Sequence, residues 1–232
     1  MTWYPESFTS IPMSDMNMRA DPSRGYPGRT YRFYIGDRVS AFGHGLSYTN
    51  FSCKFLSAPE RLSLSGYVRA ESRRHVLNGT SNGLDYIRVD NVAYCNSLRF
   101  HVQILVNNDG DLDGSQVGLL FSQVPKSFEG APKKQIIGFD RVHAQSYKSA
   151  ETSILVDPCQ HLSIVNEQGN KILPLGDHTL IVEDMKHTLS IEHDRRRYSF
   201  EFAYRPSASE VILFQFLFLV STVAASVSFL RT

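Results

Sequence analysis

The sequence predicts a mainly β protein whose short strands form a β-sandwich. Three observations lead to this fold class. Apolar and polar residues alternate in several segments after position 46, turn residues separate these segments, and apolar residues at helical spacing are rare among them. The first 46 residues and the C-terminal end of the chain depart from this pattern.

The alternation is clearest in RFHVQILVNN, residues 99–108, where His101 and Gln103 would face solvent. Its apolar side chains would share the opposite face: Phe100, Val102, Ile104 and Val106. The turn NDGDLDG and the strand SQVGLLFSQ follow, which predicts a hairpin. Other strand candidates are KQIIGFDRVH, TSILVD, LSIVN, GDHTLIVED and HTLSIEH. About seven short strands separated by turns are typical of sandwiches of the immunoglobulin or fibronectin type III kind.

The domain organisation follows from these patterns. Residues 1–46 contain proline and glycine too often for long elements, so they are predicted to form an irregular connector on the surface of another domain. Residues 47–204 would form the sandwich, with RRYSFEFAYR as a further edge strand. A polar segment at about 66–94 is predicted to be a long loop inserted into it.

The C-terminal segment VILFQFLFLVSTVAASVSFL, residues 211–230, contains no charged residue. A helix of about 20 residues matches the roughly 30 Å hydrocarbon core of a bilayer. We therefore expect a C-terminal hydrophobic helix that acts as a transmembrane or membrane-anchoring segment. The alternative is a tail from a misread gene structure.

The composition and motifs indicate no active site, cofactor or metal centre within this chain. With 24 Lys and Arg against 23 Asp and Glu, the net charge of +1 does not favour nucleic acid as a partner. The segment DGDLDG, residues 109–114, begins like a calcium loop, but Leu120 stands where such a loop needs a glutamate, so a turn is expected. Gly43 and Gly45, which flank His44, would let the backbone pass close to a neighbour, so a packing role is expected for His44 rather than a catalytic one.

The cysteines and two glycosylation sequons favour an oxidising compartment. Cys95 precedes one predicted strand and Cys159 follows another, so they form the candidate disulfide and leave Cys53 free. The sequons place N-linked glycans on Asn50 and Asn78. The N-terminal residues MTWYPESFTS lack the features of a signal peptide, so either the chain stays in the cytosol or its true N-terminus is missing; the second option is expected.

Long segments of the chain resemble the C-terminal region of family 3 glycoside hydrolases, in particular the plant β-D-xylosidases, some of which also act as α-L-arabinofuranosidases. The resemblance begins with TWYPESFTSIPMSDMNMRADPSRGYPGRTYRFYIG and AFGHGLSYTNF. It resumes at VQILVNNDGDLDGSQVGLLFS, KQIIGFDRVH, VDPCQHLSIVNEQGNKILPLGDHTLIVED and KHTLSIE, and covers roughly residues 2–193.

The resemblance implies a parent enzyme with a (β/α)₈ barrel, an α/β sandwich domain and a fibronectin type III-like domain. Residues 1–46 would be the end of the α/β domain and the connector, and the barrel and α/β domain would be the partners of this chain. Both catalytic carboxylates would lie upstream, so none is assigned here. The chain itself is expected to be non-catalytic, reaching xylo-oligosaccharides only through those domains, outside the cell or in the cell wall.

Two other functions are compatible with the same residues. The chain could be a non-catalytic β-sandwich that is tethered to a membrane by residues 211–230 and acts as a binding or interaction module. It could also be a truncated product without a function of its own. Coding sequence upstream of Met1 that specifies a barrel would favour the enzyme part.

Overall fold

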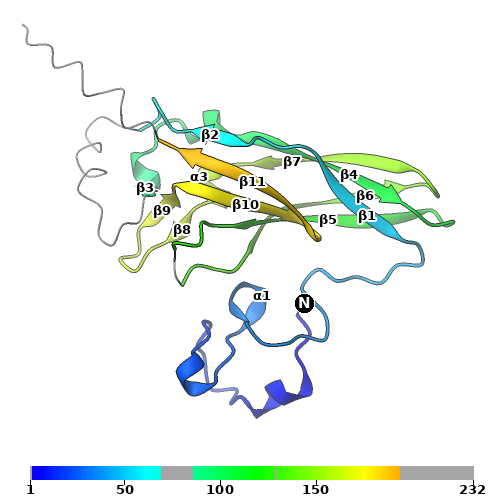
Figure 1. Ribbon diagram of the computed structural model, residues 1–232, viewed down its shortest axis with the longest axis horizontal. Helices are drawn as coiled ribbons and strands as arrows, with labels where there is room; N and C mark the ends of the chain where they lie inside the picture. Colours follow the sequence, from blue (N-terminus) through cyan, green and yellow to red (C-terminus); the bar gives the residue numbers. More distant parts are fainter. Residues whose placement is uncertain (1, 69–85, 129, 194–232) are drawn as a thin grey trace, which may run out of the picture. The chain divides into compact units, whose positions relative to one another are not determined.

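The structure is a computed structural model that describes residues 2–68, 86–128 and 130–193. The described part of the chain is mainly β, as predicted (Figure 1). The expected hydrophobic helix at 211–230, the edge strand RRYSFEFAYR and the sequon at Asn78 lie outside the described residues. Within them, no helix is long and apolar enough to cross a membrane.

The strands form two main sheets and one small sheet. The first sheet has the order β1–β4–β7 and is antiparallel: β1 (Phe51–Ser57), β4 (Phe100–Asn108) and β7 (Ser149–Val156). The second has the order β2–β11–β10–β5–β6: β2 (Arg61–Ser63), β11 (Met185–Glu192), β10 (Gly176–Val182), β5 (Gly114–Gln123) and β6 (Gln135–Ala144). Its strands pair antiparallel except β2 with β11, which run parallel.

The core lies between the inner faces of the two main sheets. In β4 every second side chain is buried, with Val102, Ile104 and Val106 inside and His101 and Gln103 exposed, which confirms the predicted alternation. The second sheet contributes Leu120, Leu180 and Leu189 to the same cluster of buried side chains. Because side chains alternate across a strand, a one-residue slip would expose each of these faces, and the register is therefore strongly specified.

The predicted hairpin between β4 and β5 is wrong. β4 pairs with β1 and β7, whereas β5 pairs with β6 and β10, so the segment between β4 and β5 crosses from one sheet to the other. Asn108 holds this crossing: its amide donates to the carbonyl oxygens of Leu112 and Ala144 at 2.7 and 3.1 Å. The segment after β4 therefore joins two sheets, and Asn108 ties it both to the turn at Leu112 and to the end of β6 at Ala144.

The predicted loop at about 66–94 is also corrected in its described part. Residues 86–88 form β3 (Tyr86–Arg88), which pairs with β9 (Lys171–Pro174), and β9 pairs with β8 (Ile164–Val165). The short helices η4 (Val89–Asn91) and η5 (Cys95–Leu98) follow β3. Ile87 is completely buried and Val92 is nearly so, which explains why this polar segment has a fixed structure.

The first 50 residues are irregular, as expected, and contain three one-turn helices: η1 (Glu6–Ser10), η2 (Pro22–Arg24) and α1 (Thr30–Phe33). The two ends of this segment meet where Trp3 and Ser40 form an isolated bridge. Rings of Tyr4, Phe8 and Tyr34 stack within it, with centroids 4.1 to 5.6 Å apart. The segment therefore has a small aromatic core of its own.

Candidate functional site

The aromatic residues around position 31 join the first 50 residues to the sandwich. The ring of Tyr31 stacks on Phe42 with centroids 4.2 Å apart and meets Phe121 of β5 edge-on at 5.9 Å. The backbone N–H of Ile136 in β6 donates to the Tyr31 hydroxyl oxygen at 3.2 Å. Tyr31 is therefore the main side-chain link between α1 and the second sheet, through both packing and a hydrogen bond.

The glycines around His44 belong to the same contact. Gly43 has a φ of +88°, and a Cβ at this position would lie 2.4 Å from Leu119 Cδ1 of β5. The backbone thus passes close to the sheet at Gly43, which agrees with the packing role expected for these glycines. A Cβ at Gly45 would meet nothing within 4 Å, so only one of the two flanking glycines is needed for close approach.

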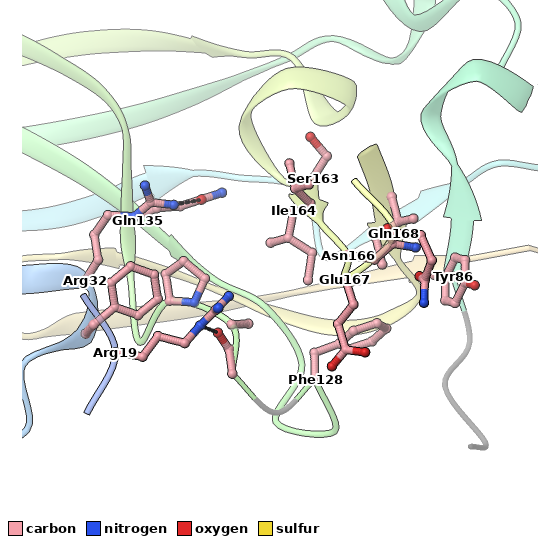
Figure 2. Close-up of a pocket in the computed structure, with 16 residues that line it drawn as sticks. Arg19, Arg32, Tyr86, Phe128, Gln135, Ser163, Ile164, Asn166, Glu167 and Gln168 are labelled. Atoms are coloured by element: carbon pink, nitrogen blue, oxygen red, sulfur yellow. Dashed lines mark hydrogen bonds between the residues drawn. The ribbon is translucent and has the colours of Figure 1, made fainter. Parts of the chain in front are cut away.

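A cavity of about 790 Å³ lies between the first segment and the small sheet. Figure 2 shows Arg32 and Gln135 on one side, Tyr86 and Gln168 on the other, and Arg19 and Phe128 along the lower edge. Its lining combines two arginines with aromatic rings and amide side chains. A volume of this size is typical of small-molecule sites.

Both arginines of the cavity contact the aromatic ring of Phe33. The guanidinium carbons of Arg19 and Arg32 lie 5.5 and 5.6 Å from the centroid of the Phe33 ring. Arg19 Nε donates to the Gly130 carbonyl oxygen at 2.9 Å, and Arg32 Nη2 donates to Gln135 Oε1 at 3.4 Å. Arg32 Nε is buried without a hydrogen-bond partner in the described part of the chain.

The loop between β8 and β9 forms the far lip of the cavity. Asn166 accepts a hydrogen bond from the Asn170 backbone at its Oδ1 atom, 2.8 Å away, which closes the turn tightly. Gly169, with a φ of +78°, completes it. The turn leaves Glu167 and Gln168 exposed at the rim, where their side chains can contact a ligand.

The carboxylates of the turn at 109–113 have structural partners. Asp109 Oδ2 accepts from the Ser52 hydroxyl at 2.9 Å, and Asp113 Oδ1 accepts from the Ser146 backbone at 2.8 Å. No group of three or more His, Cys, Asp or Glu residues within residues 2–68, 86–128 and 130–193 is arranged to hold a metal. These hydrogen bonds explain the aspartates of DGDLDG as parts of the turn.

Two other acidic residues in the first segment are paired with Arg24. The pKa of Asp15 is lowered by the backbone N–H of Asn17 and by Arg24, and that of Asp21 is lowered by Ser23 and Arg24. Hydrogen bonds and a nearby cation both stabilise the ionised form. A general acid for glycoside hydrolysis needs the opposite, a pKa raised toward neutrality.

The predicted cysteine and sequon residues lie at separate positions of the sandwich. Cys95 of η5 and Cys159 of α3 (Pro158–His161) are joined as a disulfide, whereas Cys53 is a buried free thiol. Asn50 is exposed directly before β1, so its side chain is accessible to a glycan. None of these residues lines the cavity.

The first 50 residues also expose an unusual amount of apolar surface. Met13 and Met16 are 88% and 81% exposed, and Leu46 and Tyr48 are 96% and 98% exposed. Trp3 and Val39 are exposed as well. Exposed apolar side chains of this size are candidates for burial against another domain. We use the name apolar face for this set of exposed residues: Trp3, Met13, Met16, Val39, Leu46 and Tyr48.

Sequence reasoning missed the cavity, because its lining residues come from four separated stretches of the chain. The available signal was the segment MNMRADPSRGYPGRTYRF, which contains four arginines between aromatic residues. Aromatic and arginine side chains are common in binding sites. The residues that complete the cavity, such as Tyr86 and Glu167, carry no such signal in the sequence.

Comparison with known proteins finds that this chain is similar to part of several plant β-xylosidases. Residues 116–186 match the family model of the fibronectin type III-like domain. Over 193 residues the chain is 51% identical to probable beta-D-xylosidase 6 of Arabidopsis thaliana. This alignment covers 82% of the chain and 24% of the relative. It is 40% identical over 193 residues to beta-xylosidase/alpha-L-arabinofuranosidase 2 of Medicago sativa subsp. varia, again covering 82% of the chain and 24% of the relative.

A solved structure is also similar to this chain. The chain superposes with a TM-score of 0.62 and 25% identity on a GH3 exo-beta-xylosidase in complex with a xylobiose aziridine activity-based probe, covering 82% of this chain and 23% of that one. The chain therefore spans about a quarter of the length of the curated relatives it matches.

Proposed function

We propose, from the premise that this chain is a relative of the fibronectin type III-like C-terminal part of family 3 β-xylosidases, that it is the non-catalytic C-terminal portion of such a glycoside hydrolase. The parent enzyme would cleave O-glycosidic bonds in xylan or arabinoxylan fragments. The chain would contribute by covering and stabilising the upstream domains.

The apolar face is the observation that carries this role. Tyr31 and Gly43 hold the first segment against the sandwich, and the same segment turns Met13 and Met16 toward solvent. Burying apolar surface is worth roughly 25 cal/mol for each Å² removed from water, so these side chains favour a covered state. An α/β domain directly upstream in the same polypeptide is the partner that this position favours.

The acidic residues support a non-catalytic chain. Retaining glycosidases place two carboxyl groups about 5–5.5 Å apart and keep one protonated. The carboxylates of Asp15 and Asp21 are instead stabilised in the ionised form, and Asp157 is paired with Arg99 at 2.9 Å. Each of these carboxylates has a partner that fits a structural role.

We extend the proposal to the location of the protein. A Cys95–Cys159 disulfide and an accessible sequon at Asn50 both suit an oxidising, secretory route, and thus an extracellular or cell-wall enzyme. If the apolar residues 211–230 insert into a bilayer, they would add a single membrane attachment to this product.

A chimera tests the proposal directly. The 232-residue chain replaces the matching C-terminal part of the Arabidopsis relative, behind that protein's own upstream domains. We expect the chimera to hydrolyse nitrophenyl β-xyloside, and the same protein without any C-terminal part to be insoluble or inactive. An equally active protein without the C-terminal part would show that the chain has no supporting role.

A second experiment compares a change in the apolar face with a matched change elsewhere on the chain. Substituting Met13 and Met16 by serine in the chimera should reduce its thermal stability, because both side chains would be buried against the upstream domain. Met185→Ser, at an exposed methionine of β11, should not. Equal effects of the two changes would argue against the face as the contact.

A further inference from the structure

The arginine end of the cavity has a charge that the described protein leaves uncompensated. Arg19 and Arg32 share the Phe33 ring, and neither forms an ion pair with a described carboxylate. Among the described residues, the lining contains two arginines and one acid, Glu167. Two neighbouring cations around one ring repel each other, and a bound anion would relieve this repulsion.

The hydrogen-bonding capacity of the two guanidinium groups points the same way. A guanidinium has five N–H donors, and each of these arginines is bonded to one protein acceptor. Arg32 Nε is in addition buried and unpartnered among the described residues, which is costly unless a ligand accepts its hydrogen. Planar guanidinium donors match the two oxygens of a carboxylate.

The rest of the lining suits a ligand larger than a simple anion. A cavity of about 790 Å³ has far more room than an inorganic ion needs. Phe128 and Tyr86 offer ring faces against which the C–H face of a sugar can pack. The side chains of Asn166, Gln168 and Glu167 offer donors and acceptors for hydroxyl groups.

We propose that this cavity binds a saccharide that carries a carboxylate, such as a uronic acid attached to a short xylose chain. Arg19 and Arg32 take the carboxylate, and the neutral sugar rings extend toward Tyr86 and Gln168 on the opposite side of the cavity (Figure 2). The choice of a saccharide over another hydroxylated acid rests on the proposed function, whereas the choice of a carboxylate rests on the arginines alone.

Calorimetric titration of the full 232-residue chain tests the site with four probes: xylotriose bearing a glucuronic acid substituent, unsubstituted xylotriose, glucuronate and inorganic phosphate. We expect the acidic oligosaccharide to bind at least about tenfold more tightly than xylotriose, because only it pairs with the arginines. Glucuronate should bind more weakly than the acidic oligosaccharide. Phosphate binding as tightly as the oligosaccharide would reduce the site to an anion site and overturn the saccharide proposal.

Three substitutions separate binding from folding. Arg19→Gln, at an exposed position, should weaken binding of the acidic oligosaccharide about tenfold. Arg141→Gln removes the same charge from the exposed part of β6, outside the lining, and should leave binding unchanged. Glu167→Gln should keep or tighten binding, because it removes a negative charge from the rim. Thermal unfolding of each variant checks that the fold is retained.

Equal affinity for xylotriose and its acidic derivative, an equal loss from Arg141→Gln, or no binding of any probe would overturn the proposal. These results are independent of the chimera. An active chimera with a chain that binds no acidic saccharide would refute the site and keep the proposed function. An inactive chimera together with a chain that binds the acidic saccharide would refute the proposed function and keep the site.

Discussion

His178 is a completely buried polar residue whose protonation state is determined by its surroundings. Nε2 donates to the Pro174 carbonyl oxygen at 2.9 Å, and Nδ1 is buried without a partner among the described residues. Burial lowers the pKa of His178, and it also lowers that of His161. The neutral form of His178 is therefore favoured in the folded chain, because charging this ring would place a cation in the core.

The lowered pKa of His178 predicts acid sensitivity. The unfolded chain takes up a proton near the ordinary histidine pKa of 6.5, and the folded chain resists it until lower pH. Stability is thus fully present above pH 6.5 and is lost as the pH falls through the folded pKa. In His178→Gln, whose amide can donate to Pro174, we expect a smaller difference in unfolding free energy between pH 7 and pH 5. The exposed His101→Gln serves as control, and an equal flattening there would contradict the prediction.

Cys53 is the second residue whose chemistry is controlled by its surroundings. Burial and the nearby Glu183 carboxylate raise the pKa of its thiol to about 12. The Cys53 thiol donates to Glu183 Oε1 at 3.3 Å, so the carboxylate favours the protonated form. Since the thiolate is the nucleophile, the folded chain should react very slowly with iodoacetamide at pH 9. Glu183→Gln should react faster, and rapid alkylation of the unmodified folded chain would refute this assignment.

The disulfide connects two short elements that flank the first sheet. It joins η5, before β4, to α3, after β7, and the two cysteines are 64 positions apart in the sequence. In the chain-entropy model, closing a loop of this length contributes about 4 kcal/mol to stability. The double substitution Cys95→Ser and Cys159→Ser should lower the unfolding free energy by about this amount. A peptide map with both thiols free, or no change on reduction, would contradict the pairing.

The contact of α1 with the second sheet predicts a separable first segment. Tyr31→Ala removes the stack on Phe42, the edge contact with Phe121 and the acceptor for the Ile136 N–H. We expect a loss of about 2 kcal/mol and faster proteolysis within residues 2–50, while the sandwich stays intact. Tyr48→Ala in the same segment is the control, because Tyr48 is almost fully exposed. Equal proteolysis of both variants would show that Tyr31 does not anchor the segment.

At the scale of the whole molecule, the chain presents a packed sandwich with a connector that exposes its apolar face. Such a chain is folded by its own core and still incomplete at its surface. The relatives extend well beyond the matched region, which is 24% of their length, so an upstream domain of a longer protein would account for this combination under the proposed function. Under the proposed function, the catalytic work belongs to residues outside this chain.

This division of labour predicts that the purified chain alone will not hydrolyse nitrophenyl β-xyloside or arabinoside. Under the proposed function, the pair of carboxyl groups with separated pKa values that retaining hydrolysis requires lies in the upstream domains. The measurement is release of nitrophenol by the chain and by the chimera at equal concentration. Turnover by the chain alone, abolished by changing one of its own carboxylates, would overturn the prediction.

Much of the fold could be predicted from the sequence because strand alternation is a local property. Side chains in a strand alternate between two faces, so the buried face of β4 is legible from residues 99–108 alone. The irregular structure of the first segment could be predicted for a similar reason, since proline and glycine interrupt regular elements wherever they occur. The family resemblance could be recognised from long matching segments.

The tertiary structure alone decided which strands pair and which distant residues meet. The turn after β4 leads to the opposite sheet, with Asn108 bonded both to the turn at Leu112 and to the end of β6 at Ala144, and no local pattern distinguishes this crossing from a hairpin. Ile87 is buried within a polar stretch because β9 pairs with β3. Arg19, Tyr86 and Glu167 form one cavity although they are far apart in the chain. The sequence by itself therefore determined strands, faces and family, because these depend on neighbours along the chain, whereas pairing and the cavity depend on contacts that form only when the chain is folded.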